Sequence, residues 1–205
     1  MPDASHAILN SSQPLPAGPL SAEMEEILER IAGGLYSLAS MLVGEGEASI
    51  RLVEAAVANA EISVCQDPEE ARRSSSRELG SAAIDLLAER DPESLAAPEG
   101  VSPVSVCIED DDLASAGISA EELQSMIAGP ERDRVRNWLA GLPVSLRIVF
   151  VLRAVAGFTT EETALLLKAH GGPQAAGWNP EAVREVFRQG LCSLASQLIH
   201  ATAAR

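Results

Sequence analysis

Residues 142–198 constrain this chain most, because three apolar stretches there are separated by recognisable helix boundaries. The first stretch repeats apolar residues with the spacing of one helix face: Ile148, Val151, Leu152 and Val155. Thr159 with Glu162 three positions later is a capping-box signature, which predicts the start of a second helix. Asn179 before a proline predicts the start of a third. Its apolar stripe has nearly one residue per turn: Val183, Phe187, Leu191, Leu194 and Leu198.

Two short helices followed by a longer one with a single buried stripe outline a helix-turn-helix. Long polar side chains on the last helix are predicted to face away from the stripe and to reach base edges or phosphates. The predicted DNA-binding residues are Arg184, Glu185, Arg188 and Gln189, together with Asn179 at the helix start. The connection at 170–178 is longer than the three- or four-residue turn of a compact helix-turn-helix. We expect Trp178 to pack back onto the core there.

These segments resemble region 4 of an extracytoplasmic-function sigma factor. The resemblance rests on residues 142–153 and 157–162, and on Val183, Phe187, Gly190 and Leu194. In that family, region 4 reads the upstream (minus thirty-five) promoter element and rests on RNA polymerase. The resemblance therefore implies double-stranded promoter DNA and core RNA polymerase as partners.

The first half of the chain resembles region 2 of the same family, at residues 38–48, 52–55 and 83–90. In the family, the middle segment docks on the polymerase clamp. The residues that the resemblance assigns to polymerase binding are Arg51, Leu52, Glu54 and Ala55. An anti-sigma protein is a further candidate partner.

Several departures from the family favour an alternative function. No aromatic residue lies between Tyr36 and Trp138, although a flipped promoter base needs a group to receive it. Arg51 and Glu54 stand where the family usually has Asp and Gln, and Glu185 stands where it often has a serine. The alternative is a sigma-like regulatory or structural interaction protein that no longer binds promoter DNA.

The two halves of the chain also differ in net charge. The formal net charge is −15, yet residues 132–205 hold nine basic and five acidic side chains. Only this part has the sign that a phosphate backbone attracts. We therefore predict an all-α protein of two small helical domains joined by a flexible acidic linker. The divisions are a disordered tail (1–20), a region 2-like domain (21–90), a linker with one short helix (91–131) and a helix-turn-helix domain (132–205).

The linker and its neighbourhood allow finer predictions. Capping-box signatures predict helix starts at Ser75 and at Ser119. Val101, Val104, Val106 and Ile108 suggest an extended segment laid against a domain. The four consecutive acids at 109–112 suggest a solvated charge run, or else a metal site or a mimic of nucleic acid.

Other classes of chemistry find little support in the sequence. Three widely separated cysteines argue against a disulfide framework or a zinc site, and Cys192 is expected to be an unreactive, at least half-buried thiol. The histidines have no ligand spacing, and phosphate-binding and nucleophile motifs are missing, so we expect neither an enzyme nor a cofactor. Without an export signal or a membrane span, a cytoplasmic location is expected.

Overall fold

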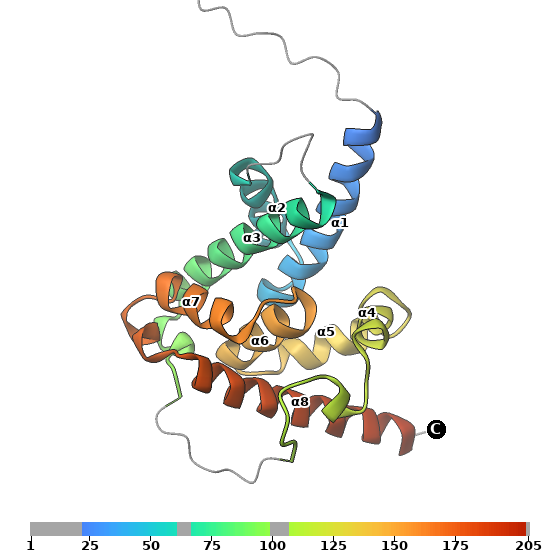
Figure 1. Cartoon of the computed structure of the whole chain (residues 1–205), viewed down its shortest axis with the longest axis vertical. Helices are drawn as coiled ribbons and strands as arrows, with labels where there is room; N and C mark the ends of the chain where they lie inside the picture. The colour runs from blue at the N-terminus through green and yellow to red at the C-terminus, as the bar shows by residue number, and fades with distance from the viewer. Residues whose placement is uncertain (1–21, 61–66, 99–106, 204–205) are drawn as a thin grey trace, which may run out of the picture.

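The computed structural model describes residues 22–60, 67–98 and 107–203. Within these ranges the chain forms eight α-helices and no strand, which confirms the all-α class (Figure 1). The predicted tail at 1–20 and the extended segment at Val101, Val104 and Val106 lie outside the described residues.

The first half of the chain is a bundle of three helices. These are α1 (Ala22–Val43), α2 (Glu47–Asn59) and α3 (Pro68–Arg90), and each packs against the other two. The predicted helix start at Ser75 is wrong, because α3 already begins at Pro68 and runs through it. Asp67 caps this start by accepting a hydrogen bond from the Glu69 N–H at 2.9 Å. The Ser75 hydroxyl instead donates to the Ala71 carbonyl inside the helix.

The second half builds on the longest helix. In chain order it holds the 3₁₀ turns η1 (Pro92–Leu95) and η2 (Ala114–Ala116), then α4 (Ala120–Ala128), α5 (Arg132–Ala140), α6 (Val144–Phe150), the π-helical turn η3 (Val151–Val155), α7 (Thr160–His170), the 3₁₀ turn η4 (Pro173–Gly177) and α8 (Pro180–Ala203). The capping box predicted at Ser119 is present at the start of α4. In Figure 1, α8 lies across the base of the molecule, with α5 to α7 between it and the first three helices.

One continuous hydrophobic core runs through both halves. It extends from Leu35 and Leu42 in α1 to Phe150 in α6 and Leu191 in α8. The two halves meet where α3 packs on α7 and α1 on α5. Because the described halves share this core, their packing does not separate one domain from the other. The predicted division into two domains stays a prediction.

Candidate nucleic-acid interface

Helices α6, α7 and α8 lie on the three stretches of residues 142–198 that the sequence predicts to be helical. Gly157, at φ 72°, adopts a backbone conformation that favours glycine and lets the chain reverse after η3. The Thr159 hydroxyl then accepts from the Glu162 N–H at 3.1 Å, while the Glu162 carboxylate accepts from the Thr159 N–H at 2.8 Å. Both α6 and α7 pack on α8.

The long connection before α8 is folded against the rest of the protein. Trp178 is fully buried, and its indole N–H donates to the Leu95 carbonyl at 2.8 Å. The expected packing of Trp178 on the core is therefore confirmed. Asn179 then caps α8, because its side-chain oxygen accepts from the Ala182 N–H at 2.9 Å.

Two of the predicted DNA-binding residues, Arg184 and Gln189, are exposed on α8. The Arg184 side chain is 47% exposed, and its guanidinium lies 3.6 Å from the Asp111 carboxylate. Gln189 donates a long, 3.5 Å hydrogen bond to Glu185. Asn179 is also exposed, although its side chain already serves the helix cap.

The prediction that Glu185 faces outward is wrong. Its exposed fraction is 5%, and its carboxylate accepts from the Arg188 guanidinium at 2.5 Å. The prediction assumed that α8 is packed on a single side. However, η2 packs against α8 as well, and the Glu109 carbonyl accepts from Arg188 at 3.2 Å, so the linker covers a further part of the helix. Only 24% of the Arg188 side chain is exposed.

Residues 109–112 lie against this side of α8. Asp111 accepts from Arg153 at 3.3 Å and also lies beside Arg184, while the Glu109 carbonyl accepts from Arg188 at 3.2 Å. We call residues 109–112 the acidic segment, and Arg153, Arg184 and Arg188 the arginine cluster. The Asp112 carboxylate accepts from the N–H and the hydroxyl of Ser115 at 2.8 and 2.9 Å, and these hydrogen bonds lower the pKa of its carboxyl.

Sequence reasoning did not include Arg153 among the site residues. Its guanidinium donates to the Phe158 carbonyl and to Asp111, and its central carbon lies 4.8 Å from the centre of the Phe187 ring. Only 18% of the side chain is exposed. Arg153 lies at the end of the segment 142–153 that resembles the family. However, nothing in the sequence of this segment indicates that residues 109–112 fold back against Arg153.

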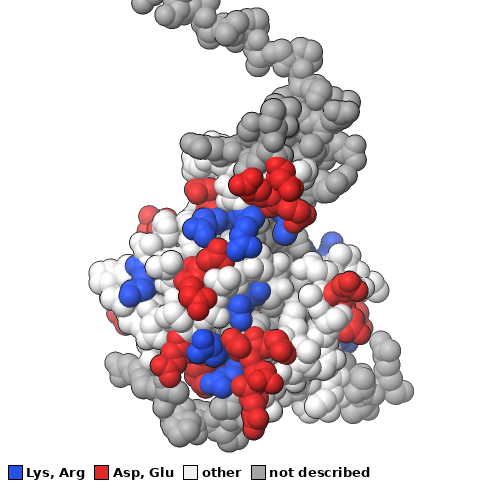
Figure 2. Space-filling view, viewed as in Figure 1, with Lys and Arg blue, Asp and Glu red and all other residues white. Residues whose placement is uncertain are grey.

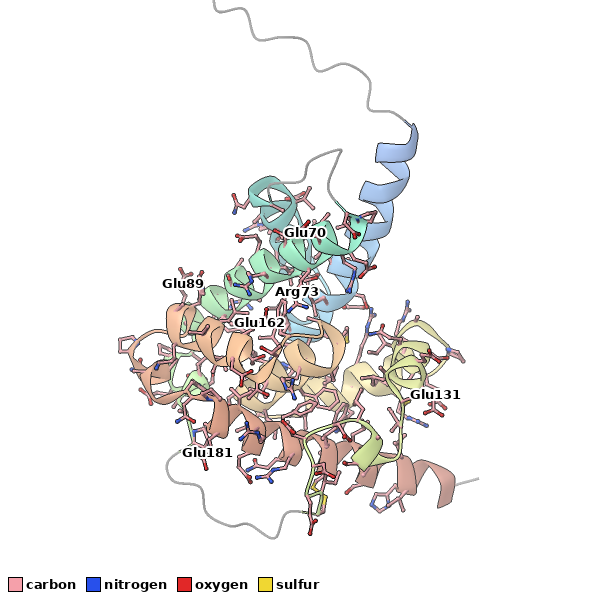
Figure 3. The ribbon with its side chains drawn as sticks, in the orientation of Figure 1. Glu70, Arg73, Glu89, Glu131, Glu162 and Glu181 are labelled. Carbon is pink, nitrogen blue, oxygen red and sulfur yellow. A yellow bond between two sulfur atoms is a disulfide. The ribbon has the colours of Figure 1, made fainter. Side chains whose placement is uncertain are left out.

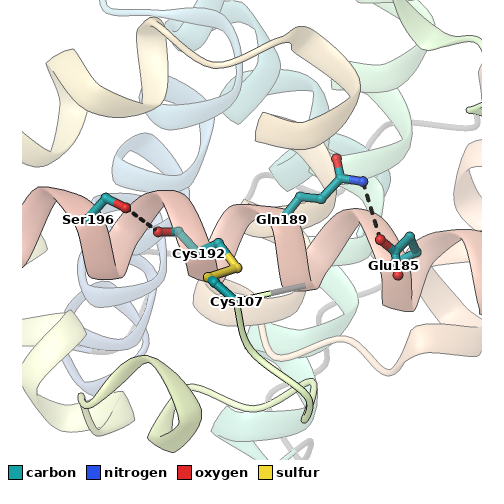
Figure 4. The surroundings of a disulfide bond; sticks show 5 residues. All are labelled: Cys107, Glu185, Gln189, Cys192 and Ser196. Carbon is teal, nitrogen blue, oxygen red and sulfur yellow. Dashed lines mark hydrogen bonds between the residues drawn. A yellow bond between two sulfur atoms is a disulfide. The ribbon is translucent and has the colours of Figure 1, made fainter. Parts of the chain in front are cut away.

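The cysteine prediction is also wrong, because Cys107 and Cys192 form a disulfide across a sequence separation of 85 (Figure 4). Distance along the chain does not prevent pairing here, since the linker folds back along α8 and brings the two Cα atoms to 5.8 Å. The bond fixes the start of the acidic segment to the middle of α8. Ile108, the next residue, is buried and belongs to the core.

The surface around α8 carries both signs of charge. In Figure 2, basic and acidic side chains alternate across this face, and no continuous basic strip runs over α8. The acidic segment supplies carboxylates beside the arginine cluster, so the net positive charge of residues 132–205 is largely compensated at this place.

The residues that the resemblance assigns to polymerase binding lie on α2. Arg51 and Glu54 are exposed, and Arg51 forms an ion pair with Glu47 at 2.5 Å. Leu52 is buried, so its side chain serves the core, whereas Ala55 is half-buried. Arg51 and Leu52 border a groove of about 440 Å³ between α2 and α3, whose other side includes Leu86.

Other kinds of site are not found in the part of the chain that the structure describes. Within residues 22–60, 67–98 and 107–203, no three histidine, cysteine or carboxylate side chains are grouped so that they could hold a metal ion. In the same ranges no helix combines the length and apolar character needed to cross a membrane. Comparisons with protein-family models, curated proteins and solved structures gave no match to the chain.

Proposed function

We propose that this chain is a sigma-factor-like transcription initiation protein, which binds core RNA polymerase through its first helices and promoter DNA through α8. The observation that carries the proposal is the packing of α6 and α7 on α8. This packing leaves Arg184 and Gln189 exposed near the start of the last helix. Residues near the start of a recognition helix are those that contact base edges in a helix-turn-helix.

The arginine cluster supplies the groups on this surface that would contact DNA. Guanidinium groups bind phosphate oxygens through two parallel hydrogen bonds, and arginine also reads guanine in the major groove. Arg184 is the most exposed of the three, with 47% of its side chain accessible. We therefore assign Arg184 the first contact with a duplex.

The test is transcription in vitro with core RNA polymerase and genomic fragments from the source organism. Addition of the reduced full-length protein is expected to give transcripts with defined start sites. Arg184→Ala is expected to weaken duplex binding and to reduce the dependence of log K on log salt concentration by about 1. Arg132→Ala is the matched control, because it removes an equally exposed cation from α5.

Equal effects of these two substitutions would mean that Arg184 acts only through the total charge of the protein. Absence of both polymerase binding and start sites with the reduced protein would refute the proposal.

The second candidate is a sigma-like regulatory or structural protein that uses the same helices for protein contacts and no longer binds promoter DNA. Burial of Glu185 and its pairing with Arg188 favour this candidate, because two of the predicted base-reading side chains contact each other. Binding to core polymerase without any affinity for duplex DNA would distinguish it from the first.

A further inference from the structure

The arginine cluster is a site for an anion, and residues of the same chain occupy it. Arg153 comes from η3 while Arg184 and Arg188 come from α8, yet all three reach the acidic segment. Asp111 bridges two of them with one carboxylate oxygen, at 3.3 Å from Arg153 and 3.6 Å from Arg184. A phosphate of a duplex offers the same chemistry to the same guanidinium groups.

The acidic segment satisfies the cluster only in part. The Nε atoms of Arg153 and Arg188 are buried and have no hydrogen-bond partner among the described residues. The contacts to the Glu109 and Asp111 oxygens are 3.2–3.6 Å long, which exceeds the usual length of a charge-assisted hydrogen bond. The acidic segment is therefore held less firmly by the arginine cluster than close ion pairs would hold it.

The disulfide determines whether such a ligand can compete. Cys107 lies two positions before the acidic segment, and Cys192 lies one turn beyond Arg188 on α8. In Figure 4 the bond lies on α8 beside Gln189. This short covalent connection keeps the carboxylates at a high effective concentration beside the arginine cluster. Without it, the segment is retained by the burial of Ile108 and Ala116, by hydrogen bonds from Arg153 and Arg188 to its backbone carbonyls, and by partly exposed ion pairs.

We propose that the acidic segment is an intramolecular competitor of duplex DNA for the arginine cluster, and that the Cys107–Cys192 disulfide controls it. The identity of the competing ligand rests on the function proposed above. In the oxidised protein the arginines are paired with the acidic segment, and in the reduced protein DNA displaces it. The bond is accessible to a reductant, because Cys107 is exposed and Cys192 is only half-buried.

The redox step requires a dithiol reductant, either a small molecule or a protein of the thioredoxin type. Its thiolate attacks one sulfur of the disulfide, and a mixed disulfide forms while the other cysteine leaves as a thiolate. The second thiol of the reductant then releases the remaining cysteine. Overall the reductant loses two electrons and two protons and becomes a disulfide, while Cys107 and Cys192 become two thiols.

The experiment measures binding of a labelled mixed-sequence duplex to the full-length chain by fluorescence anisotropy. A Cys65→Ser background removes the third cysteine as an exchange partner. We expect the reduced protein to bind at least about tenfold more tightly than the oxidised one. Its dependence on salt should be steeper by up to about 1.8, since Arg153 and Arg184 lose their pairing with Asp111 and become available to phosphates. Cys107→Ser should bind like the reduced protein with or without reductant.

Asp111→Asn and Asp110→Asn form a matched pair, because both remove one negative charge from the acidic segment. Among the described residues, Asp111 pairs with Arg153 and Arg184, whereas no ion pair involves Asp110. In the oxidised protein, Asp111→Asn should raise the affinity for the duplex several-fold more than Asp110→Asn. Equal gains would overturn the role of Asp111 as the competing group.

Equal affinity and equal salt dependence of the oxidised and reduced proteins, with reduction verified by thiol titration, would overturn the proposal. If neither form binds a duplex, the proposed function fails, and hydrogen exchange of residues 107–116 then decides the inference separately. Faster exchange in the reduced protein would support the covering of the arginine cluster by the segment. Unchanged exchange would overturn it.

Discussion

Glu162 of α7 accepts two hydrogen bonds of 2.7 Å from the guanidinium of Arg73 in α3 (Figure 3). Arg77, one turn along α3, adds a third at 3.1 Å. The same carboxylate closes the capping box of α7 with Thr159, so one side chain fixes the start of α7 and holds it against the first half of the chain. The interface between the halves is therefore polar at this edge and apolar inside.

This position makes stability depend on pH. The hydrogen bond from the Thr159 N–H, followed by the contacts of Arg73, lowers the pKa of Glu162 to about 2 from its usual 4.5, against the opposing effect of burial. The folded protein thus binds fewer protons than the unfolded chain between these values. The stabilisation is complete above about pH 5 and is lost as the pH falls towards 2. It amounts to about 2–3 kcal/mol, the pKa difference reduced for solvent screening.

Comparison of the wild type with Glu162→Gln separates the stabilisation by Glu162 from that by the other carboxylates. The free energy of unfolding, measured with urea, should differ from wild type by about 2–3 kcal/mol at pH 7. The difference should shrink steadily as the pH is lowered from 5. Glu161→Gln, at an exposed position in the same first turn, should give only a small difference. A Glu162→Gln difference that is constant with pH would contradict the assignment.

Two helical glycines should respond in opposite directions to substitution by alanine. A Cβ at Gly190 in α8 would lie 2.9 Å from the ring of Phe150, which is fully buried and cannot move aside. Gly190→Ala is therefore expected to lower the free energy of unfolding by about 1–3 kcal/mol. A Cβ at Gly33 in α1 has nothing within 4 Å, so Gly33→Ala should raise it by about 0.5–1 kcal/mol.

Thermal unfolding of both glycine variants, followed by circular dichroism, gives the comparison. The midpoint should fall for Gly190→Ala and rise for Gly33→Ala. Stabilisation by both substitutions would mean that α8 and α6 are not packed as closely as the Gly190–Phe150 contact requires.

Because Trp178 is buried, a substitution that removes its N–H group is expected to lower the free energy of unfolding. Trp178→Phe keeps an aromatic ring but leaves the Leu95 carbonyl without its donor. The expected loss is about 1–3 kcal/mol in the free energy of unfolding by urea. Trp138→Phe is the control, because the Trp138 indole donates at 2.9 Å to the Ser193 hydroxyl at a half-buried place where water can replace it. A loss for Trp138→Phe as large as for Trp178→Phe would argue against this explanation.

The successes of sequence reasoning share a local cause. The caps at Ser119, Thr159 and Asn179 are hydrogen bonds between residues three positions apart, so their geometry follows from the residue types alone. Ser75 shows the limit of such signals. Its signature lies inside α3, where an uninterrupted hydrogen-bond ladder from Asp67 onwards takes precedence over a new start.

The features that sequence reasoning missed depend on contacts between distant residues. The packing of η2 on α8 and the contact of Arg153 with Asp111, 42 residues earlier, both depend on the path of the linker. The acidic run at 109–112 looked like a solvated charge run, because charge patterning says nothing about which cations lie opposite. A third arginine in the candidate site was thus visible only once the path of the linker was known.

The disulfide should also stabilise the fold. It closes a loop with a sequence separation of 85, and a cross-link of this length removes much of the conformational freedom of the unfolded chain. Reduction is expected to lower the free energy of unfolding by about 2–4 kcal/mol in urea titrations with and without dithiol. The double variant Cys107→Ser/Cys192→Ser should match the reduced protein and be insensitive to dithiol. Cys65→Ser should keep the full sensitivity to dithiol, and loss of that sensitivity would mean that Cys65 takes part in the pairing.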